Sequence, residues 1–516
     1  MIHMLEYRVF GPPGTGKTTW ISRRIGEIVQ KYDLDKIFVC SFTRAAAQEL
    51  AGRDLPIPTA NMGTIHALCY RARETSPCAE IPASLKVWNN LHPTPTWQIG
   101  RDPTPDDPQV GVGLELATWN YMRNTQEHPI PTQFAVAWTK FKEEQGSVDF
   151  TDMLLDAPDD LGADVLFVDE AQDLTPLQWR IVRQWGSHAK VFVVVGDDDQ
   201  LLYSFLGADV STFLAPLPED HKRILHHSYR CPRAVSSTAQ RWIAQLEGRR
   251  EPKKFDPRDA EGECRHRSYT LLDPTKLLAD AADRAASGLS VLFLTQCAYM
   301  LAPLLSAMRT KGMTYSNPYR PDRADWNPLR ATAERMLGHL ACWDAWDEHR
   351  EPTASDWYDW IKLVDAKHLR RRGFKTDLKR RAEDKLPALV NPLADFDDEL
   401  LAACGDLGRL VPLMTAAGRK ACKYPLRVWQ RSGEDGLRGP HRLQVGTIHS
   451  VKGGEADVVY LFPDISAQAA QNIEDNPRPA KDALCRQVYV GMTRARESLF
   501  LCESSSRCSH AWEGKG

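Results

Sequence analysis

Short apolar runs alternate along the chain with longer segments in which apolar residues recur every three or four positions. In the first half of the chain, the runs lie at residues 7–10, 37–41, 165–168 and 191–195. Runs of this kind are typical of strands buried on both faces of a parallel sheet. Helical patterns follow at residues 18–32 and near 44–51. The alternation predicts an α/β core with helical crossovers.

A second set of the same elements follows in the second half. It comprises expected strands at 291–294, 445–448, 458–461 and 499–501, and expected helices at 301–308 and around 486–494. The sequence therefore predicts two parallel-sheet cores, each interrupted by a mainly helical insertion.

We expect six consecutive segments from these interruptions. They are the first part of core 1 (1–71), a helical insertion (72–147), the second part of core 1 (148–225), the first part of core 2 (226–314), a second helical insertion (315–440) and the second part of core 2 (441–516). The second insertion is rich in Trp, which we expect to pack in its core. Its basic segment, residues 367–381, fits a solvated helix face and a polyanion contact equally well.

Composition limits the classes of protein that the chain can represent. With 42% hydrophobic and 26% charged residues among 516, the chain is not globally disordered, and no apolar run reaches membrane-spanning length. The 12 cysteines include no CxxC pair, which fits free thiols in a reducing cytoplasm.

The net charge of −3 gives no sign of a nucleic-acid partner, but it conceals two opposite blocks. Residues 151–220 hold 3 basic and 14 acidic side chains, whereas residues 221–440 hold 38 basic and 29 acidic ones. The acidic block suits a metal site and the basic block a polyanion.

A glycine-rich loop with the sequence GPPGTGKT, residues 11–18, lies between an expected strand and an expected helix. In that position the backbone N–H groups of the loop can surround phosphate oxygens at a helix N-terminus. We expect Lys17 to reach the β- and γ-phosphates of ATP and Thr18 to hold Mg²⁺. The predicted loop residues are Gly11, Pro12, Pro13, Gly14, Thr15, Gly16, Lys17, Thr18 and Thr19.

A pair of acidic residues follows the apolar run at 165–168. Ligands of open α/β sheets bind where the strands end, so Asp169 is placed to hold Mg²⁺ through water and Glu170 to deprotonate an attacking water. Capping of the next helix would explain Asp173 but not this pair. We therefore expect nucleotide hydrolysis rather than storage.

These segments resemble those of the UvrD/Rep-like helicases of superfamily 1A, and the resemblance extends through motifs in family order from residue 11 to residue 496. The further matching segments are SFTRAA (41–46), GTIH (63–66), DFTDML (149–154), GDDDQLLYSFLGA (196–208), SYR (228–230), GTIHSVKGGE (446–455) and RQVYVGMTRAR (486–496). The resemblance implies that both cores are RecA-like.

The resemblance also implies roles for individual residues. Gln200 would sense the γ-phosphate, and Arg230 and Arg494 would be arginine fingers, which stabilise charge on the transferred phosphoryl group. Tyr229 would stack on adenine and Glu455 would bind the ribose. The implied contacts to nucleic acid are Phe42, Thr43, Thr64, His66, Tyr203, Phe205, Thr447 and His449.

From the resemblance we expect an ATP-dependent DNA helicase that moves 3′ to 5′ on single strands and acts at single/double-strand junctions. One alternative is a translocase that displaces proteins without strong unwinding, and another is an ATP-gated binding switch.

Two departures from the family stand out. Ten residues precede Gly11, where the family has an upstream adenine-reading glutamine segment, and Leu206 replaces a frequent arginine.

Overall fold

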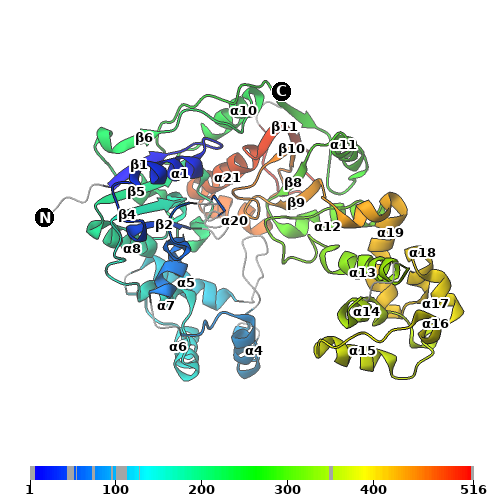
Figure 1. The fold of residues 1–516 in the computed structure, drawn as a ribbon. Helices are drawn as coiled ribbons and strands as arrows, with labels where there is room; N and C mark the ends of the chain where they lie inside the picture. Colours follow the sequence, from blue (N-terminus) through cyan, green and yellow to red (C-terminus); the bar gives the residue numbers. More distant parts are fainter. Residues whose placement is uncertain are drawn as a thin grey trace. The chain divides into compact units, whose positions relative to one another are not determined.

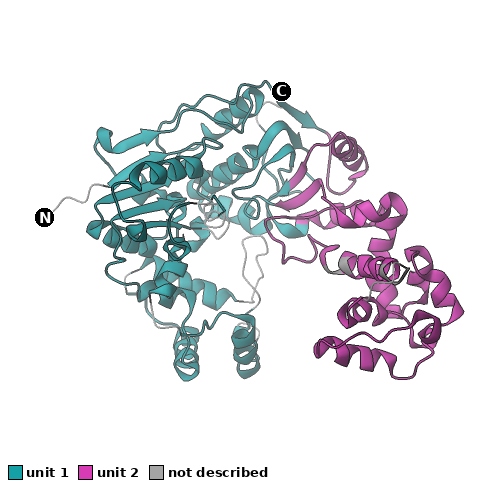
Figure 2. Cartoon of the chain, viewed as in Figure 1, with its two compact units in different colours: residues 1–267, 294–299, 447–516 teal, residues 268–293, 300–446 magenta. Residues whose placement is uncertain are grey.

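The chain forms two compact units, which Figure 2 shows in different colours. Unit 1 comprises residues 1–267, 294–299 and 447–516, and unit 2 comprises residues 268–293 and 300–446. The structure is a computed structural model and describes residues 6–42, 52–53, 55–72, 76–94, 97–99, 113–126, 128–347 and 352–512. The finer division into six segments stays a prediction.

The first sheet of unit 1 has six strands in the order β3-β2-β4-β5-β1-β6 (Figure 1). They are β1 (Glu6–Phe10), β2 (Ile37–Ser41), β3 (Met62–Thr64), β4 (Val165–Asp169), β5 (Val191–Gly196) and β6 (Lys222–Ile224). All neighbouring pairs run parallel. The four predicted strands of this core are confirmed, whereas the three-residue strands β3 and β6 have no counterpart in the prediction.

The central strand β4 is buried on both faces, which explains its continuous apolar sequence. Leu166 and Val168 pack in the same cluster as residues of α8 (Pro176–His188). Val165 and Phe167 pack in the cluster that contains α1 (Lys17–Ile28). Side chains alternate between the two faces of a strand, so helices on both sides require apolar residues at every position.

Further helices of unit 1 cover the sheets or form the first helical insertion. They are α3 (Ile65–Arg71), α4 (Pro82–Leu91), α5 (Leu114–Thr125), α6 (Gln133–Gln145), α7 (Phe150–Leu155), α9 (Val210–Phe213), α10 (Arg233–Ile243), α20 (Ala467–Asp475) and α21 (Pro477–Met492). Helices α4, α5 and α6 share an apolar core of their own that contains the buried Trp88 and Trp138. The helix expected near 44–51 lies outside the described residues.

The second sheet has five strands in the order β7-β11-β10-β8-β9. They are β7 (Glu263–Arg267), β8 (Val291–Thr295), β9 (Leu443–Thr447), β10 (Ala456–Leu461) and β11 (Ala495–Cys502). Strand β11 pairs in parallel with both β10 and β7. The chain is therefore an α/β protein with two parallel-sheet cores, as the sequence predicts, although β7 lacks an apolar run and was not expected.

Unit 2 is mainly helical. Its helices are α11 (Thr275–Ala286), α12 (Ala302–Thr310), α13 (Arg330–Asp347), α14 (Ala354–Ile361), α15 (Phe374–Glu383), α16 (Pro392–Asp395), α17 (Asp398–Ala403), α18 (Leu407–Leu410) and α19 (Ala416–Arg438). Trp357 and Trp360 are buried in the apolar cluster of this unit, which confirms core packing for these two residues. Basic side chains of residues 367–381 pair with nearby acids; one example is Arg381 with Asp377 at 3.0 Å.

Among the described helices, none is both long and apolar enough to cross a membrane. All twelve cysteines lie in the described ranges, and no disulfide joins any two of them there.

Candidate functional site

The glycine-rich loop connects β1 to α1 through two residues in the left-handed region, Gly14 (φ 72°) and Gly16 (φ 75°). A hydrogen bond from the N–H of Thr15 to the carbonyl of Pro12 closes the turn. A Cβ atom at Gly14 would lie 2.4 Å from the Cβ of Arg230. Gly14 is therefore required both for its conformation and for the close approach of the segment around Arg230.

Lys17 lies over the loop from the first turn of α1. Its Nζ donates to the carbonyl of Gly11 at 3.1 Å and lies 3.8 Å from Oε1 of Glu170. The structure thus brings the predicted phosphate-binding lysine and the predicted base together, although about 150 residues separate them in the sequence.

Glu170 follows β4 in a left-handed backbone conformation (φ 54°, ψ 38°), which is uncommon for a residue other than glycine. Such strain persists where neighbouring contacts hold it and is frequent at functional sites. One contact is a hydrogen bond of 2.6 Å from the side-chain amide of Gln172 to Oε2 of Glu170. The turn directs the carboxylate toward Lys17.

The protonation state of Glu170 follows from its neighbours. Burial alone would raise the pKa of this carboxyl group, but the cations of Lys452 and Lys17 outweigh burial and hold the pKa well below its usual range. Glu170 is therefore a carboxylate at neutral pH, the form that can accept a proton from water.

Lys452 is a central member of the site that the prediction did not include. Its buried ammonium pairs with Asp173 and lies 3.2 Å from Oε2 of Glu170. Burial lowers the pKa of Lys452 to about 8, against the opposing effect of Glu170. The available signal was its place between His449 and Glu455 in the matching segment 446–455.

Gln200 and Arg494, both predicted to act at the γ-phosphate, contact each other. Nη2 of Arg494 donates to Oε1 of Gln200 at 3.1 Å, while Nε of Arg494 donates to the carbonyl of Val490 at 2.9 Å. Burial, followed by repulsion from Arg230, lowers the pKa of Arg494 to about 10. At neutral pH the guanidinium is charged and held in a fixed orientation.

Arg230 and Glu455 form an ion pair with 2.7 Å between Nε and Oε2. Glu455 also lies 3.2 Å from Nη1 of Arg496, so one carboxylate bridges two guanidinium groups. Tyr229 is 69% exposed, and its ring lies edge-on to His227. An exposed ring at this position is accessible to a flat ligand such as a nucleobase.

Most of the predicted nucleotide-binding residues line one cavity of about 400 Å³. The lining residues are Gly14, Thr15, Gly16, Lys17, Thr18, Arg53, Glu170, Gln200, Tyr229, Arg230, Lys452, Gly453, Glu455 and Arg494. Arg53 is another residue that the prediction omitted; it donates to Thr19 at 2.9 Å. Of the other predicted residues, Gly11, Pro12, Pro13, Thr19 and Asp169 adjoin the lining residues in sequence.

The two predicted Mg²⁺ ligands fit the ion by their chemistry. Thr18 lies in the first turn of α1, and Asp169 is the buried last residue of β4. A hydroxyl and a carboxylate are the hard oxygen donors that Mg²⁺ prefers. Asp197, Asp198 and Asp199 differ, because they are paired with Lys253.

Four residues of the predicted nucleic-acid track form a cluster of rings, which we call the aromatic cluster: Phe42, Tyr203, Phe205 and His449. Ring centroids of Phe42 and Tyr203 lie 4.8 Å apart, and those of Phe205 and His449 lie 5.9 Å apart. Phe205 is 42% exposed, as is the adjacent Leu206. The cluster offers apolar ring surface to a ligand.

The remaining track residues have other contacts. His66 contacts Phe150 edge-on, and Thr64 caps α3 by accepting the N–H of Ala67. Thr447 is buried, and its Oγ1 accepts the N–H of Ser450. Thr43 lies outside the described residues.

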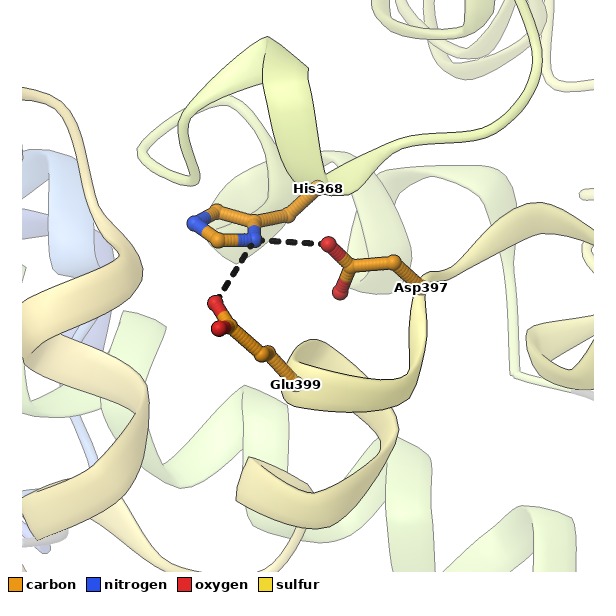
Figure 3. Close-up of side chains that lie close together, drawn as sticks. All are labelled: His368, Asp397 and Glu399. Carbon is orange, nitrogen blue, oxygen red and sulfur yellow. Dashed lines mark hydrogen bonds and ion pairs between the residues drawn. The ribbon is translucent and has the colours of Figure 1, made fainter.

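A second group of possible metal ligands lies in unit 2 (Figure 3), where Nδ1 of His368 faces Asp397 at 2.8 Å and Glu399 at 3.6 Å. Asp397 also caps α17 by accepting the N–H of Leu400. These contacts account for the group as a structural cap, and the arrangement does not require a cation.

A phosphate loop, an acidic strand end and arginines converging on one cavity define a P-loop NTPase fold with two parallel sheets. Comparison with known families agrees: residues 5–206 match an AAA domain model, and residues 443–502 match the UvrD-like helicase C-terminal domain. The chain belongs to the UvrD/Rep-like helicases of superfamily 1.

Individual relatives are distant. The chain is 25% identical over 288 residues to the ATP-dependent DNA helicase PcrA of Leuconostoc citreum, a match that covers 48% of this chain and 38% of PcrA. It is 23% identical to the putative ATP-dependent DNA helicase YjcD of Bacillus subtilis, covering 97% of this chain and 77% of YjcD. A solved chain titled "The structure of PRRSV helicase" aligns with 97% of this chain and 52% of its own, at 12% identity and a TM-score of 0.32.

Proposed function

We propose that the chain is an ATP-driven motor that translocates 3′ to 5′ on single-stranded DNA and unwinds duplex DNA at junctions. The observation that carries the proposal is the position of Lys452. This residue contacts Glu170 and Asp173 at the nucleotide cavity and lies 5.4 Å from the ring centre of Tyr203 in the aromatic cluster. One side chain therefore adjoins both the predicted base and the predicted DNA track.

The cavity suits hydrolysis of a nucleoside triphosphate. Lys17 and the loop N–H groups bind phosphate oxygens, Glu170 accepts a proton from water, and Arg494 offers a guanidinium fork to the γ-phosphate. Mg²⁺, held by Thr18 and Asp169, would neutralise charge on the phosphates. The relatives named ATP-dependent helicases support ATP as the nucleotide.

The aromatic cluster suits single strands of any sequence, because every base has a face that can stack on an aromatic ring. A base stacked on the aromatic cluster would contact Tyr203, whose ring lies beside the Lys452 ammonium. Such a contact would change the surroundings of that ammonium. Since Lys452 holds the pKa of Glu170 down, this contact links strand binding to the hydrolytic site. The 3′ to 5′ direction rests on the family resemblance.

Two assays on the full chain test the proposal. The first measures ATP hydrolysis with and without single-stranded DNA, and the second measures strand displacement on duplexes with a 3′ or a 5′ tail, with RNA tails as controls. We expect DNA-stimulated hydrolysis and displacement only from the 3′ tail. Stimulated hydrolysis without displacement would favour the translocase alternative, and slow hydrolysis indifferent to DNA would favour the switch.

A variant pair tests the aromatic cluster. Phe205→Ala removes an exposed ring, and we expect single-strand affinity to fall roughly 5–150-fold because base stacking contributes about 1–3 kcal/mol per base. Tyr299→Ala is the matched control, since Tyr299 is also exposed (55%) and is not a member of the cluster. Equal affinity of both variants for oligonucleotides, measured by fluorescence anisotropy, would remove the cluster from the track.

A further inference from the structure

Three consecutive carboxylates after β5 surround one buried lysine of a different segment. The Lys253 side chain is 1% exposed, and its Nζ lies 3.0 Å from Oδ1 of Asp197, 3.1 Å from Oδ2 of Asp199 and in contact with Asp198. Arg250 adds a two-pronged pair with Asp199, at 3.0 and 2.7 Å. We call these five residues the Asp197 network.

Keeping the carboxylates of the network ionised in a buried position costs free energy. Three adjacent buried carboxylates repel one another and cannot all ionise without cations beside them. Burial and the neighbouring carboxylates raise the pKa of Asp198 to about 6 even with Lys253 in contact. Burial alone would lower the pKa of Lys253, but the three carboxylates raise it above its ordinary value. Lys253 is therefore a cation at neutral pH and compensates the charge of the three carboxylates around it.

The network continues into the nucleotide site by two routes. Oδ2 of Asp197 accepts the side-chain amide N–H of Gln200 at 2.7 Å. This bond fixes which way the amide points, and the Gln200 oxygen then faces Arg494 at 3.1 Å. On the second route, the backbone N–H of Asp197 donates to Gln172 at 2.9 Å, and Gln172 donates to Glu170.

We propose that Lys253 is a positioning residue of the nucleotide site, which holds Asp197 so that Gln200 presents its amide oxygen to Arg494, and that Arg250 supports this arrangement by holding Asp199, whose N–H donates to Asp197. Neither residue lies in a segment that resembles a family motif, and neither lines the cavity. Lys253 acts at a distance through one carboxylate and one amide, and Arg250 acts through Asp199 in addition. The proposal rests on the proposed function, because its consequence for the chemistry is a consequence for ATP hydrolysis.

A double-mutant cycle on the full chain tests the proposal. Lys253→Met keeps the length of the side chain and removes the charge, and we expect kcat for ATP to fall about 10–100-fold while KM changes less than about 3-fold, because a displaced catalytic group costs rate rather than substrate affinity. In the Gln200→Ala background, the same substitution should change kcat less than about 2-fold. Lys253→Arg, which keeps the charge, should recover part of the loss.

A merely structural role predicts a different pattern. Lys253→Met would then lower activity only in proportion to the fraction of unfolded chain, equally in both backgrounds, and that result would overturn the proposal. Lys142→Met is the control, because Lys142 is also buried and paired with carboxylates but lies outside the nucleotide site. It should lower the melting temperature and leave kcat per folded molecule unchanged.

Two further measurements cover the cases in which Lys253→Met does not fold or the unaltered chain does not hydrolyse ATP. If Lys253→Met does not fold, Arg250→Lys replaces it, since Arg250 is partly exposed and the variant loses only the two-pronged geometry. If the unaltered chain does not hydrolyse ATP, the proposed function fails, and the cycle is then measured as affinity for a fluorescent ATP analogue. Independent effects of the Lys253 and Gln200 substitutions on that affinity would overturn the positioning role separately.

Discussion

Unit 1 contains two similar networks of buried charged residues, and the contacts of the two networks lead to different parts of the molecule. The Asp149 network consists of Arg123, Lys142, Asp149 and Asp152, and ties α5 and α6 to the start of α7. Like the Asp197 network, it has two cations, and its central carboxylate is completely buried. Asp149 accepts hydrogen bonds from Arg123, Lys142 and the indole of Trp138, and it caps α7.

The two networks differ in where the contacts of the central carboxylate lead. Contacts of Asp149 lead to a helix cap and to the apolar core of the first helical insertion. Contacts of Asp197 lead through Gln200 to Arg494 and through Gln172 to Glu170. Burial and ion pairing cost desolvation in both places and do not by themselves indicate catalysis. The continuation of a network into a cavity is the better guide to function.

The largest expected effect is at the end of the Asp197 network. Arg494→Ala removes the guanidinium that Gln200 and the carbonyl of Val490 hold in place. We expect ATP turnover to fall about 10³–10⁵-fold, the range typical of an arginine finger. The measurement is steady-state hydrolysis, with circular dichroism to establish that the variant is folded. A folded variant with normal turnover would exclude Arg494 from the chemistry.

Glu170→Gln tests the second route from Asp197. The amide keeps the shape of the side chain but cannot accept a proton from water, so turnover should fall about 10²–10⁴-fold while ATP binding is retained. Lys17→Ala should lower turnover to a similar extent, and its affinity for a fluorescent ATP analogue should fall, because the proposed function has Lys17 bind the phosphates. Lys190→Ala, at an exposed lysine paired with Asp164, is the control that should leave both unchanged. A Glu170→Gln enzyme with parental turnover would exclude Glu170 as the base.

Lys142→Met tests how much the Asp149 network contributes to the free energy of unfolding. Removing one partner of a buried ion pair leaves an uncompensated charge, and we expect the free energy of unfolding to fall by about 3–5 kcal/mol. The neighbouring Lys140 is 75% exposed in its side chain, so Lys140→Met should cost less than about 0.5 kcal/mol in the same urea titration. Similar losses in the two variants would show that the Asp149 network contributes little.

The sequence predicted those parts of the site whose residues lie next to one another in the chain. The loop from Gly11 to Thr18 and the Asp169–Glu170 pair are runs of neighbouring residues beside an apolar strand, and the structure places Lys17 and Glu170 at one cavity. Lys253 has no such signal. It lies 55 residues from Asp198 in a segment that reads as an ordinary charged loop, and only the tertiary fold brings the two together.

The same reasoning accounts for the strands that were not predicted. β4 is apolar throughout because helices cover both its faces. β7, with the sequence ECRHR, lies at the edge of its sheet and pairs with β11. An edge strand with exposed positions needs no apolar run, so periodicity could not reveal it. Lys452 falls between these cases: the matching motif contained it, but its pairing with Asp173, 279 residues away, required the fold.

The smallest expected effect is a pH dependence at the rim of the Asp149 network. Glu80 accepts the N–H of Phe150 at 2.9 Å, and burial, then repulsion from Asp149, raises its pKa to about 7. Since the folded pKa lies above the unfolded one, the stability from protonated Glu80 is complete below about pH 4.5 and is lost as the pH rises through about 7.

Glu80→Gln keeps the acceptor without a proton to lose. Compared with the unaltered chain, the variant should gain stability on the order of 2 kcal/mol between pH 5 and pH 8, measured by urea unfolding. The gain should shrink in an Asp149→Asn background, because the repelling charge is gone. A difference independent of pH would show that folding does not raise the pKa of Glu80.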